Sequence, residues 1–190
     1  MSMKPVLCIQ VDAEIQLRLL EERHAEAYLA LIERNRERLR AWIAVDAYEG
    51  PVEVLRDYLR KRLLQFVEGD GYHLGIWCQD DLVGLLDYRL NRRQQTAELG
   101  YWLDVAQQGK GVVTRACRTM VRHAFEVHHL QKVVISCAAD NLRSRAVAER
   151  LGFTLEGTLQ RASWFRDRYV DGVWYGLLAS EWQERAETRQ

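Results

Sequence analysis

A chain of 190 residues, 48% of them hydrophobic, is long enough to bury a substantial core. The 27 Lys and Arg residues balance the 27 Asp and Glu residues, so the net charge of zero gives no global field that would attract nucleic acid. No apolar run approaches the roughly 18 residues that indicate a membrane span, and residues 1–10 lack a signal-peptide pattern. We therefore expect one cytoplasmic domain over residues 1–190, without a membrane or a direct nucleic-acid partner.

The first half of the chain is expected to be mainly helical. Residues 6–10 and 14–20 should form an extended first strand before the helices begin. Apolar residues then recur at helical spacing and predict helices over residues 22–35, over 36–42, and from Pro51 to the Gly69-Asp70-Gly71 segment. Pro51 favours a first helical turn because its fixed φ suits that position and no N–H is needed there.

From residue 72 the pattern changes to short β-type runs. The predicted strands cover residues 72–79, 82–90, 94–103, 132–139, 157–165 and 169–178. The predicted helices of this part cover residues 115–128 and 144–151. Asp80-Asp81 is expected to form the first hairpin turn and residues 166–168 the last, with a bulge at Asp171-Gly172. The polar tail over residues 183–190 is expected to be frayed.

The cysteines indicate neither disulfides nor a zinc site. Cys8, Cys78, Cys117 and Cys137 are widely spaced, and no Cys-x-x-Cys pair occurs. This spacing predicts buried or half-buried free thiols of a cytosolic protein, and no metal site is expected.

The segment that carries most information is Gln107-Gln108-Gly109-Lys110-Gly111-Val112-Val113-Thr114. It follows a predicted strand and opens a predicted helix, so it presents unpaired backbone N–H groups together with the positive end of a helix dipole. Gly109 and Gly111 have no Cβ and would let the backbone approach an anion closely. The segment lacks the Lys-Ser/Thr pair of a P-loop and the third glycine of a dinucleotide fingerprint. It therefore predicts a pyrophosphate site of another kind.

This segment resembles the acyl-CoA loop of the GCN5-related N-acetyltransferase (GNAT) family, Gln/Arg-x-x-Gly-x-Gly/Ala. Gln108 takes the first place and Gly111 the fourth, whereas Val113 stands where Gly or Ala is usual. Downstream, Asn141-Leu-Arg-Ser144, the helix after it and Gly152-Phe153 resemble the family's Asn-x-x-Ser segment and its following helix. The order and spacing of these matches are most similar to the RimL/RimJ-type N-terminal acetyltransferases of ribosomal proteins.

The resemblance covers about residues 15–182 and implies the GNAT fold, a mixed α/β (α+β) architecture. A mostly antiparallel seven-stranded sheet is then flanked by about four helices. In the family this sheet splays between its fourth and fifth strands, here residues 98–103 and 133–139. The thioester of acetyl-CoA sits in that gap.

The resemblance also implies the reaction, in which an amine attacks acetyl-CoA directly within a ternary complex. Because an α-amine has a pKa near 7.7–8.0, a carboxylate that accepts its proton helps at neutral pH. Glu98 matches the position that the ribosomal-protein branch uses as general base, although a plain cross-strand glutamate is the alternative. Ser144 is the candidate proton donor to the CoA sulfur, and Asn141 the candidate partner of the pantetheine arm. The alternative for Ser144 is a helix cap, and the alternative for Asn141 is an ordinary turn residue.

Further cofactor contacts follow from the same resemblance. Backbone N–H groups at Trp102 and Leu103, freed by a bulge, would polarise the thioester carbonyl. The expected diphosphate contacts are Gln108, Gly109, Lys110, Gly111, Val113 and Thr114. Arg115 and Arg143 are candidates for the 3′-phosphate of CoA, but an exposed helix position explains each of them as well.

The acceptor is open between three hypotheses. The first is the N-terminal α-amine of a protein, such as an acidic ribosomal protein that would suit the basic stretch Arg34, Arg36, Arg38 and Arg40. Trp42, Trp164 and Trp174 could line its groove, although a core or solvated role explains all of these side chains too. The second is a small amine, a polyamine or an antibiotic, which would require a carboxylate cluster that the sequence does not show. The third is a CoA-binding module without turnover, against which the presence of Glu98 and Ser144 argues. A homodimer through the late strands or the first helices also stays open.

Overall fold

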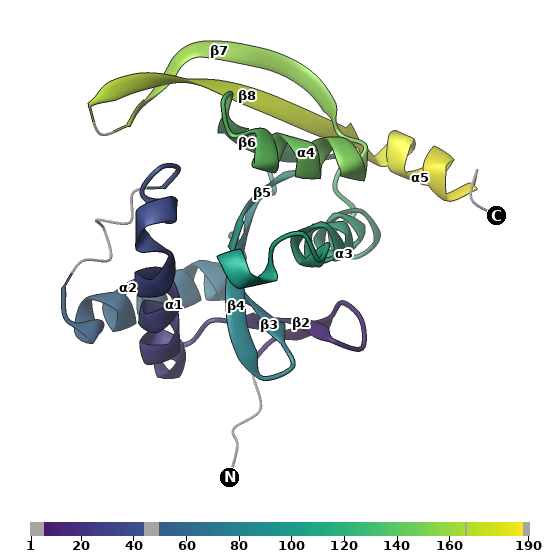
Figure 1. Ribbon diagram of the computed structural model, residues 1–190. Coiled ribbons are helices and arrows are strands. Elements are labelled where there is room, and N and C mark those ends of the chain that lie inside the picture. The colour runs from purple at the N-terminus through teal and green to yellow at the C-terminus, as the bar shows by residue number, and fades with distance from the viewer. Residues whose placement is uncertain (1–5, 44–49, 166, 188–190) are drawn as a thin grey trace. The chain divides into compact units, whose positions relative to one another are not determined.

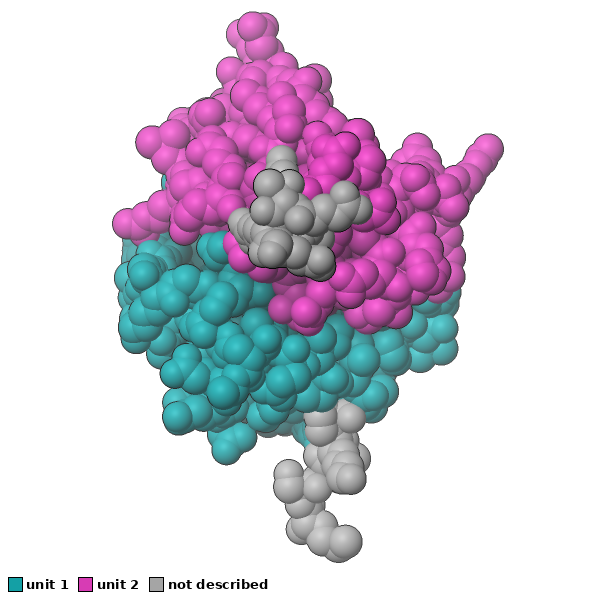
Figure 2. Space-filling model, turned by 90° about the vertical axis from the view of Figure 1, so that its right-hand side faces the viewer, with its two compact units in different colours: residues 1–88, 101–116 teal, residues 89–100, 117–190 magenta. Residues whose placement is uncertain are grey.

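The computed structural model describes residues 6–43, 50–165 and 167–187 (Figure 1). The chain divides into two compact units, which Figure 2 shows in teal and magenta. Unit 1 comprises residues 1–88 and 101–116, and unit 2 comprises residues 89–100 and 117–190. None of the described helices combines the length and the hydrophobicity that crossing a bilayer requires.

The described strands form an open sheet in the order β1-β2-β3-β4-β5-β6-β8-β7. The strands are β1 (Cys8–Gln10), β2 (Ile15–Leu19), β3 (Gly71–Cys78), β4 (Asp81–Asn91), β5 (Thr96–Leu103), β6 (Lys132–Ala138), β7 (Thr154–Phe165) and β8 (Arg168–Leu178). The α-helices are α1 (Ala25–Leu39), α2 (Val52–Glu68), α3 (Val112–Glu126), α4 (Leu142–Leu151) and α5 (Ala179–Glu187). The mixed α/β class predicted from the sequence is confirmed, with eight strands in the described part instead of seven.

The additional strand arises at the start of the chain, where one extended strand was expected. β1 and β2 instead form an antiparallel hairpin in which Cys8 pairs with Arg18 and Gln10 with Gln16. The Asp12 carboxylate turns the chain, because its Oδ1 accepts hydrogen bonds from the backbone N–H groups of Glu14 and Ile15 at 2.9 and 3.0 Å. A short polar side chain that bonds its own backbone two or three residues on is a common way to make such a turn.

In unit 1, α1 packs against α2, and α2 packs against β3. The core on this side is built from buried apolar residues of both helices and of β3 and β4, including Tyr28, Leu31, Leu55, Leu59 and Leu82. The sequence predicted a break in the first helix near Asn35, but α1 continues without one. Asn35 is 3% exposed and donates to the carbonyl of Leu31 at 3.0 Å, so its side chain is satisfied inside the helix and does not end it.

The ends of α2 agree with the sequence prediction. Pro51 is the N-cap residue, and Gly69 ends the helix with φ 78°, a left-handed conformation that glycine adopts without a Cβ penalty. The β3–β4 turn differs from the predicted Asp80-Asp81 pair by one position. It lies at Gln79-Asp80, with Gln79 at φ 56°, and Asp81 already belongs to β4.

In unit 2, β6 pairs with β8 from Lys132–Leu178 to Ala138–Gly172, and β8 pairs in turn with β7. The β7–β8 ribbon extends beyond the end of β6 (Figure 1). A bulge was predicted at Asp171-Gly172 of β8. The register does shift there, but the extra residues lie on the partner strand β7, between Leu159, which pairs with Gly172, and Ser163, which pairs with Val170. Asp171 faces this shift, and its carboxylate accepts from the N–H of Arg161 at 2.7 Å.

The C-terminal part of the chain is more ordered than the sequence predicts. The predicted turn over residues 166–168 includes Arg166, which lies outside the described residues. β7 ends at Phe165 as expected, whereas β8 begins at Arg168, one residue before the predicted start at residue 169. The prediction of a frayed tail from residue 183 was wrong up to residue 187, because α5 continues to Glu187. The Glu181 carboxylate accepts from the N–H of Leu178 at 2.8 Å at the start of this helix. Residues 188–190 lie outside the described part.

Candidate active site

The pairing of β5 with β6 is short. Their parallel register runs from Thr96–Lys132 to Leu99–Ile135, whereas β5 continues to Leu103 and β6 to Ala138. β6 instead continues its pairing with β8 through Ser136, Cys137 and Ala138. The register therefore ends where the resemblance places the splay of the sheet.

Unit 1 contains the glycine-bearing loop. After β5, Asp104 caps a single 3-10 turn, η3 (Val105–Gln107), and its carboxylate accepts from the N–H of Ala106 at 3.2 Å. Gly109 and Gly111 follow with φ values of 76° and 72°. Any side chain is strained in that left-handed region, so the need for glycine comes from the backbone conformation. A Cβ at either position would have no atom within 4 Å, so the space around both is open to a ligand.

The helix after the loop begins three residues earlier than expected. α3 starts at Val112, and the N–H of Arg115 donates to the carbonyl of Gly111 at 3.0 Å. Val113 and Thr114 therefore lie in the first helical turn, where backbone N–H groups have no partner within the helix. These N–H groups and the helix dipole are the donors that suit a diphosphate. Lys110 donates to the Gln107 side chain at 2.9 Å and stays within the loop.

The end of β5 is tightly constrained inside unit 1. A Cβ on Gly84 of β4 would lie 2.6 Å from the carbonyl oxygen of Trp102, so only glycine permits this close approach. Trp102 stacks on Tyr28 with ring centroids 6.2 Å apart. The side chain of Arg38 donates to the carbonyl of Leu103, which is itself buried. The predicted bulge at Trp102 and Leu103 remains a prediction.

Unit 2 carries Glu98 on β5, and two groups hold its carboxylate. Ser136 of β6 donates from its hydroxyl to Glu98 Oε1 at 2.6 Å, and Arg89 of β4 approaches the same oxygen at 2.9 Å. Among the described residues, no donor contacts Glu98 Oε2. Glu98 is about one third exposed, so this oxygen can accept a proton from a group that approaches from solvent.

Ser144 and Asn141 lie at the start of α4, also in unit 2. Asn141 is the N-cap residue, and its Oδ1 accepts from the backbone N–H of Ser144 at 3.2 Å. The Ser144 side chain therefore does not act as the cap, and its hydroxyl forms a hydrogen bond with the thiol of Cys137. Burial raises the pKa of this thiol, and the contact with Ser144 partly offsets the effect. Asn141 therefore has the capping role that was the alternative for Ser144, and its expected contact with pantetheine stays a prediction.

The two candidate catalytic residues approach β6 from opposite sides. Ser136 and Cys137 are consecutive on this strand, so their side chains point to opposite faces. Ser136 contacts Glu98 and Cys137 contacts Ser144. A proton acceptor on one face and a hydroxyl on the other suit an amine and a thioester that approach β6 from different sides.

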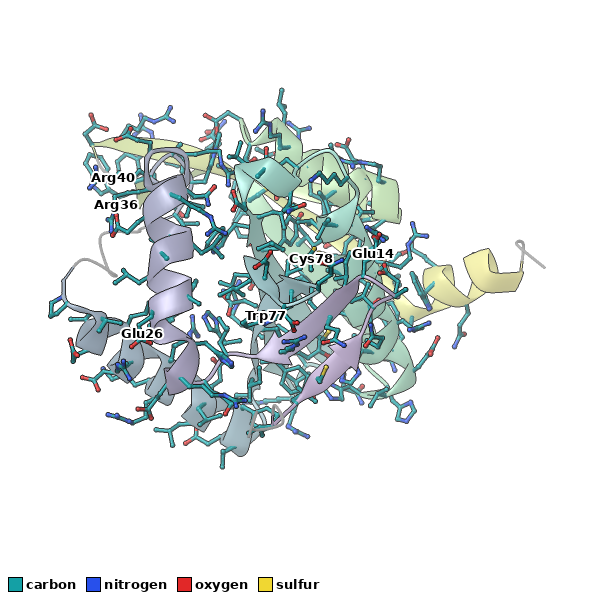
Figure 3. All side chains as sticks on the ribbon, turned by 60° about the horizontal axis from the view of Figure 1, so that its bottom comes forward. Glu14, Glu26, Arg36, Arg40, Trp77 and Cys78 are labelled. Atoms are coloured by element: carbon teal, nitrogen blue, oxygen red, sulfur yellow. The ribbon has the colours of Figure 1, made fainter. Side chains whose placement is uncertain are left out.

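Several arginines that were candidates for contacts with the cofactor or the acceptor have partners within the chain. Arg115 pairs with Asp12 at 2.8 Å and with Glu14 at 3.5 Å. Arg36 pairs with Glu33, and Figure 3 labels Arg36 and Arg40 at the same end of α1. The side chains of Arg34 and Arg38 contact the segment between β5 and η3, at Asp104 and Leu103. Most arginines of the basic stretch therefore form ion pairs or hydrogen bonds inside unit 1.

The tryptophans proposed for an acceptor groove lie on different elements, Trp42 in unit 1 and Trp164 and Trp174 in unit 2. Trp42 is 38% exposed in unit 1, and Trp164 is 60% exposed on β7. Trp164 stacks edge-on with Tyr169 across the β7–β8 turn at 4.8 Å. Trp174 is half-buried on β8, where it pairs with Ser136 and therefore lies on the same face as Glu98.

Sequence reasoning missed the residues that hold the candidates in place. Ser136, Arg89 and Cys137 carry no local motif, and their roles follow from strand register. Asp104 could have been found, because an aspartate directly after a strand and before a helical turn is a common N-cap. Across the described residues, no three His, Cys, Asp or Glu side chains form a group that could hold a metal ion.

Residues 14–154 match the family model described as "Acetyltransferase (GNAT) domain". The chain belongs to the GNAT family. It is an N-acetyltransferase that uses acetyl-CoA, and the open space at Gly109 and Gly111 with the N–H groups that follow fits the diphosphate of this cofactor.

Curated relatives cover nearly the whole chain. The N-acetyltransferase YdaF of Bacillus subtilis (strain 168) is 34% identical over 92% of this chain and 96% of its own length. The ribosomal-protein-serine acetyltransferase of Escherichia coli (strain K12) is 30% identical over 90% of this chain and 96% of its own length. The spermidine N(1)-acetyltransferase of the same organism is 27% identical over 84% of this chain and 83% of its own length.

Solved structures of the family superpose well. RimL, the ribosomal L7/L12 α-N-protein acetyltransferase, in complex with coenzyme A has a TM-score of 0.87 at 28% identity, and the match covers 92% of this chain and 99% of that one. The microcin C7 self-immunity acetyltransferase MccE in complex with acetyl-CoA and AMP has a TM-score of 0.85 at 28% identity, covering 90% of this chain and 95% of that one. The predicted cofactor and the predicted likeness to RimL are thereby confirmed.

Proposed function

We propose that this enzyme acetylates the N-terminal α-amine of a protein of the ribosomal type. The observation that carries the proposal is the 30% identity with the ribosomal-protein-serine acetyltransferase, which covers 96% of that relative. RimL bound to coenzyme A gives structural support, with a TM-score of 0.87. The family model runs from residue 14 to residue 154 and so includes sequence from both units. We therefore treat residues 1–190 as one acetyltransferase domain in this proposal.

The proposed reaction is a direct attack of the amine on the acetyl group. Acetyl-CoA supplies an activated acyl group when it is bound. Glu98 Oε2 accepts a proton from the amine, directly or through water, while Ser136 and Arg89 hold the other oxygen. The C–N bond would form as the thioester C–S bond breaks, and the Ser144 hydroxyl, which contacts Cys137 on the opposite side of β6, would donate to the departing sulfur. Placement of Glu98 and Ser144 on opposite faces of β6 supports a direct transfer, because the amine and the thioester can then approach each other from the two faces.

The proposed cofactor contacts combine backbone and side-chain donors. The N–H groups of Val113 and Thr114 belong to the first turn of α3, and Gly109 and Gly111 give them an unobstructed approach. The full proposed set is Trp102, Leu103, Gln108, Gly109, Lys110, Gly111, Val113, Thr114, Asn141 and Ser144. Arg115 is a weaker candidate for the 3′-phosphate, because Asp12 and Glu14 already pair with it.

A small polyamine is the second candidate acceptor, because the spermidine N(1)-acetyltransferase is 27% identical over 84% of the chain. A polyamine carries several positive charges and needs carboxylates that face it together. In the described part of the chain, no three acidic, His or Cys side chains come close enough together to hold a metal ion, so no compact carboxylate cluster of that kind is present. Glu98 itself is paired with Arg89, which would repel a polycation. These charges favour the protein α-amine.

Mass spectrometry distinguishes the two acceptors. The protein is incubated with acetyl-CoA and either a serine-initiated acidic peptide, the same peptide with a blocked α-amine, or spermidine. We expect one added acetyl group on the free peptide and none on the blocked peptide, even where that peptide contains lysine. Acetylation of spermidine alone would replace the proposed acceptor with a polyamine. Binding of CoA without any product would show a module without turnover.

A further inference from the structure

One face of α1 makes several polar contacts to the segment that joins β5 to the cofactor loop. Arg34 donates from Nε to Asp104 Oδ2 at 2.6 Å, and Arg38 donates to the carbonyl of Leu103. Asn35 accepts from the backbone N–H of Val105 at 3.1 Å. All of these residues belong to unit 1. Three consecutive residues, from Leu103 to Val105, are therefore held by a single helical turn of α1.

Asp104 connects this contact to the loop itself. One oxygen of its carboxylate accepts from Arg34, and the other accepts from the N–H of Ala106 and so caps η3. The Asp104 side chain is 9% exposed. Burial alone would raise its pKa, but the hydrogen bonds from Ala106 and Arg34 outweigh burial and hold the pKa below its ordinary value. The carboxylate is thus ionised at neutral pH and shared between α1 and the loop.

The loop needs such support, because its ligand is bound through backbone groups. A diphosphate gains affinity only when several N–H groups already point to one place, since ordering them on binding costs free energy. A Cβ at Gly109 or Gly111 would meet no atom within 4 Å, so no side chain packs at these two positions to hold the loop. The direction of the loop is therefore set at η3, which ends one residue before Gln108.

We infer that Arg34, Asn35 and Asp104 are positioning residues for acetyl-CoA, and that α1 holds the diphosphate loop in its binding conformation. We assign none of the three a contact with the cofactor. This inference rests on the proposed cofactor role of the loop and is independent of the acceptor. A failure to acetylate peptides leaves CoA affinity measurable, so the two proposals fail separately.

The test uses CoA affinity, measured by calorimetry, and thermal unfolding of the same samples. The variants are Arg34→Met, Asp104→Asn and the double variant. Arg36→Met is the matched control, because Arg36 lies on the same helix and pairs with Glu33. Arg34→Met should weaken CoA binding by about tenfold, as expected for loss of a charge-assisted hydrogen bond. Arg36→Met should leave the affinity within about twofold.

Asp104→Asn separates positioning from simple charge attraction. Removal of a negative charge near the loop would strengthen the binding of an anion if only the net charge mattered. Positioning predicts the opposite, a loss of about tenfold, because Asn accepts more weakly from Ala106 and Arg34. The double variant should bind CoA no more weakly than the single variant with the lower affinity, because both substitutions break the same Arg34–Asp104 contact.

A kinetic measurement completes the test. In the positioning variants the KM for acetyl-CoA should rise while kcat at saturating cofactor stays within about twofold. If Arg34→Met does not fold, Arg34→Lys keeps the charge but not the Nε geometry, and it should show the same rise in KM. Unchanged affinity in folded Arg34 variants, tighter binding in Asp104→Asn, or an equal loss in Arg36→Met would overturn the inference.

Discussion

Ser136 and Cys137 are neighbours on β6 whose side chains serve the two candidate catalytic residues on opposite faces of the strand. Ser136 donates to Glu98 at 2.6 Å, and Cys137 forms a hydrogen bond with Ser144. The parallel pairing of β6 with β5 has ended one residue before Ser136. A strand that separates from one neighbour at this position can present different side chains to the groups on its two faces.

Glu98→Gln should lower kcat by about 10²-fold near neutral pH, the lower end of what general-base catalysis contributes. CoA affinity should change little, because Glu98 is assigned no cofactor contact. At higher pH the loss should become smaller, since more of the α-amine is then already neutral. The pH profile of kcat and calorimetry with CoA check this prediction. Glu53→Gln, at an exposed position of α2, is the control. Equal losses of turnover and affinity without recovery at high pH would give Glu98 a structural role.

Ser136→Ala should reduce kcat several-fold and change its pH profile. Without the Ser136 hydroxyl, Arg89 is left as the described partner that holds the Glu98 carboxylate, so the carboxylate is less firmly placed. Ser136→Thr retains a hydroxyl on a β-branched side chain that suits a strand, and it should restore most of the activity. A purely structural serine would lower the melting temperature in the Ala variant without moving the pH profile.

Alkylation of Cys137 should report the occupancy of the cofactor site. Burial raises the pKa of the Cys137 thiol, so alkylation should be slow at neutral pH and become faster as the pH rises. Because Ser144 contacts this thiol and is proposed to lie at the CoA sulfur, CoA should protect Cys137. Cys8 is exposed, so the expectation of a buried or half-buried thiol was wrong for this residue, and it should react at the same rate with and without CoA. Peptide mapping by mass spectrometry measures both rates, and equal rates for Cys137 would place Ser144 away from the sulfur.

Stability should fall as the pH drops below about 6.5, the ordinary pKa of histidine. Burial lowers the pKa of His123 and of His128, and His123 lowers the pKa of His128 further. Their ring centroids are 4.7 Å apart. Because the folded pKa values are depressed, the unfolded chain takes up protons first, and the loss continues until the pH passes the folded values. The melting temperature between pH 8 and pH 5 measures this dependence. The fall of the melting temperature with decreasing pH should be less steep in His128→Gln, and an unchanged slope would contradict the prediction.

The residues of the candidate site differ in how far the sequence could reveal them. The glycine-bearing loop is a local pattern, since strand, turn and helix follow one another directly within residues 96–126. The φ values of Gly109 and Gly111 agree with that reading. Ser136 and Glu98 are 38 positions apart, and Arg34 and Asp104 are 70 positions apart. No local pattern connects such pairs, because strand register and helix packing decide them.

The sequence by itself determined the family, the cofactor and most of the helix and strand boundaries, because hydrophobic periodicity, glycine placement and short motifs act over a few residues. Tertiary structure decided that Asn35 lies inside a continuous α1, where its side chain supports Val105. It also decided that residues 8–19 form a hairpin and that most of the basic stretch is occupied within the chain. The physical reason is that a polar side chain takes the partner that the fold brings to it. That choice is fixed only when segments distant in sequence pack together.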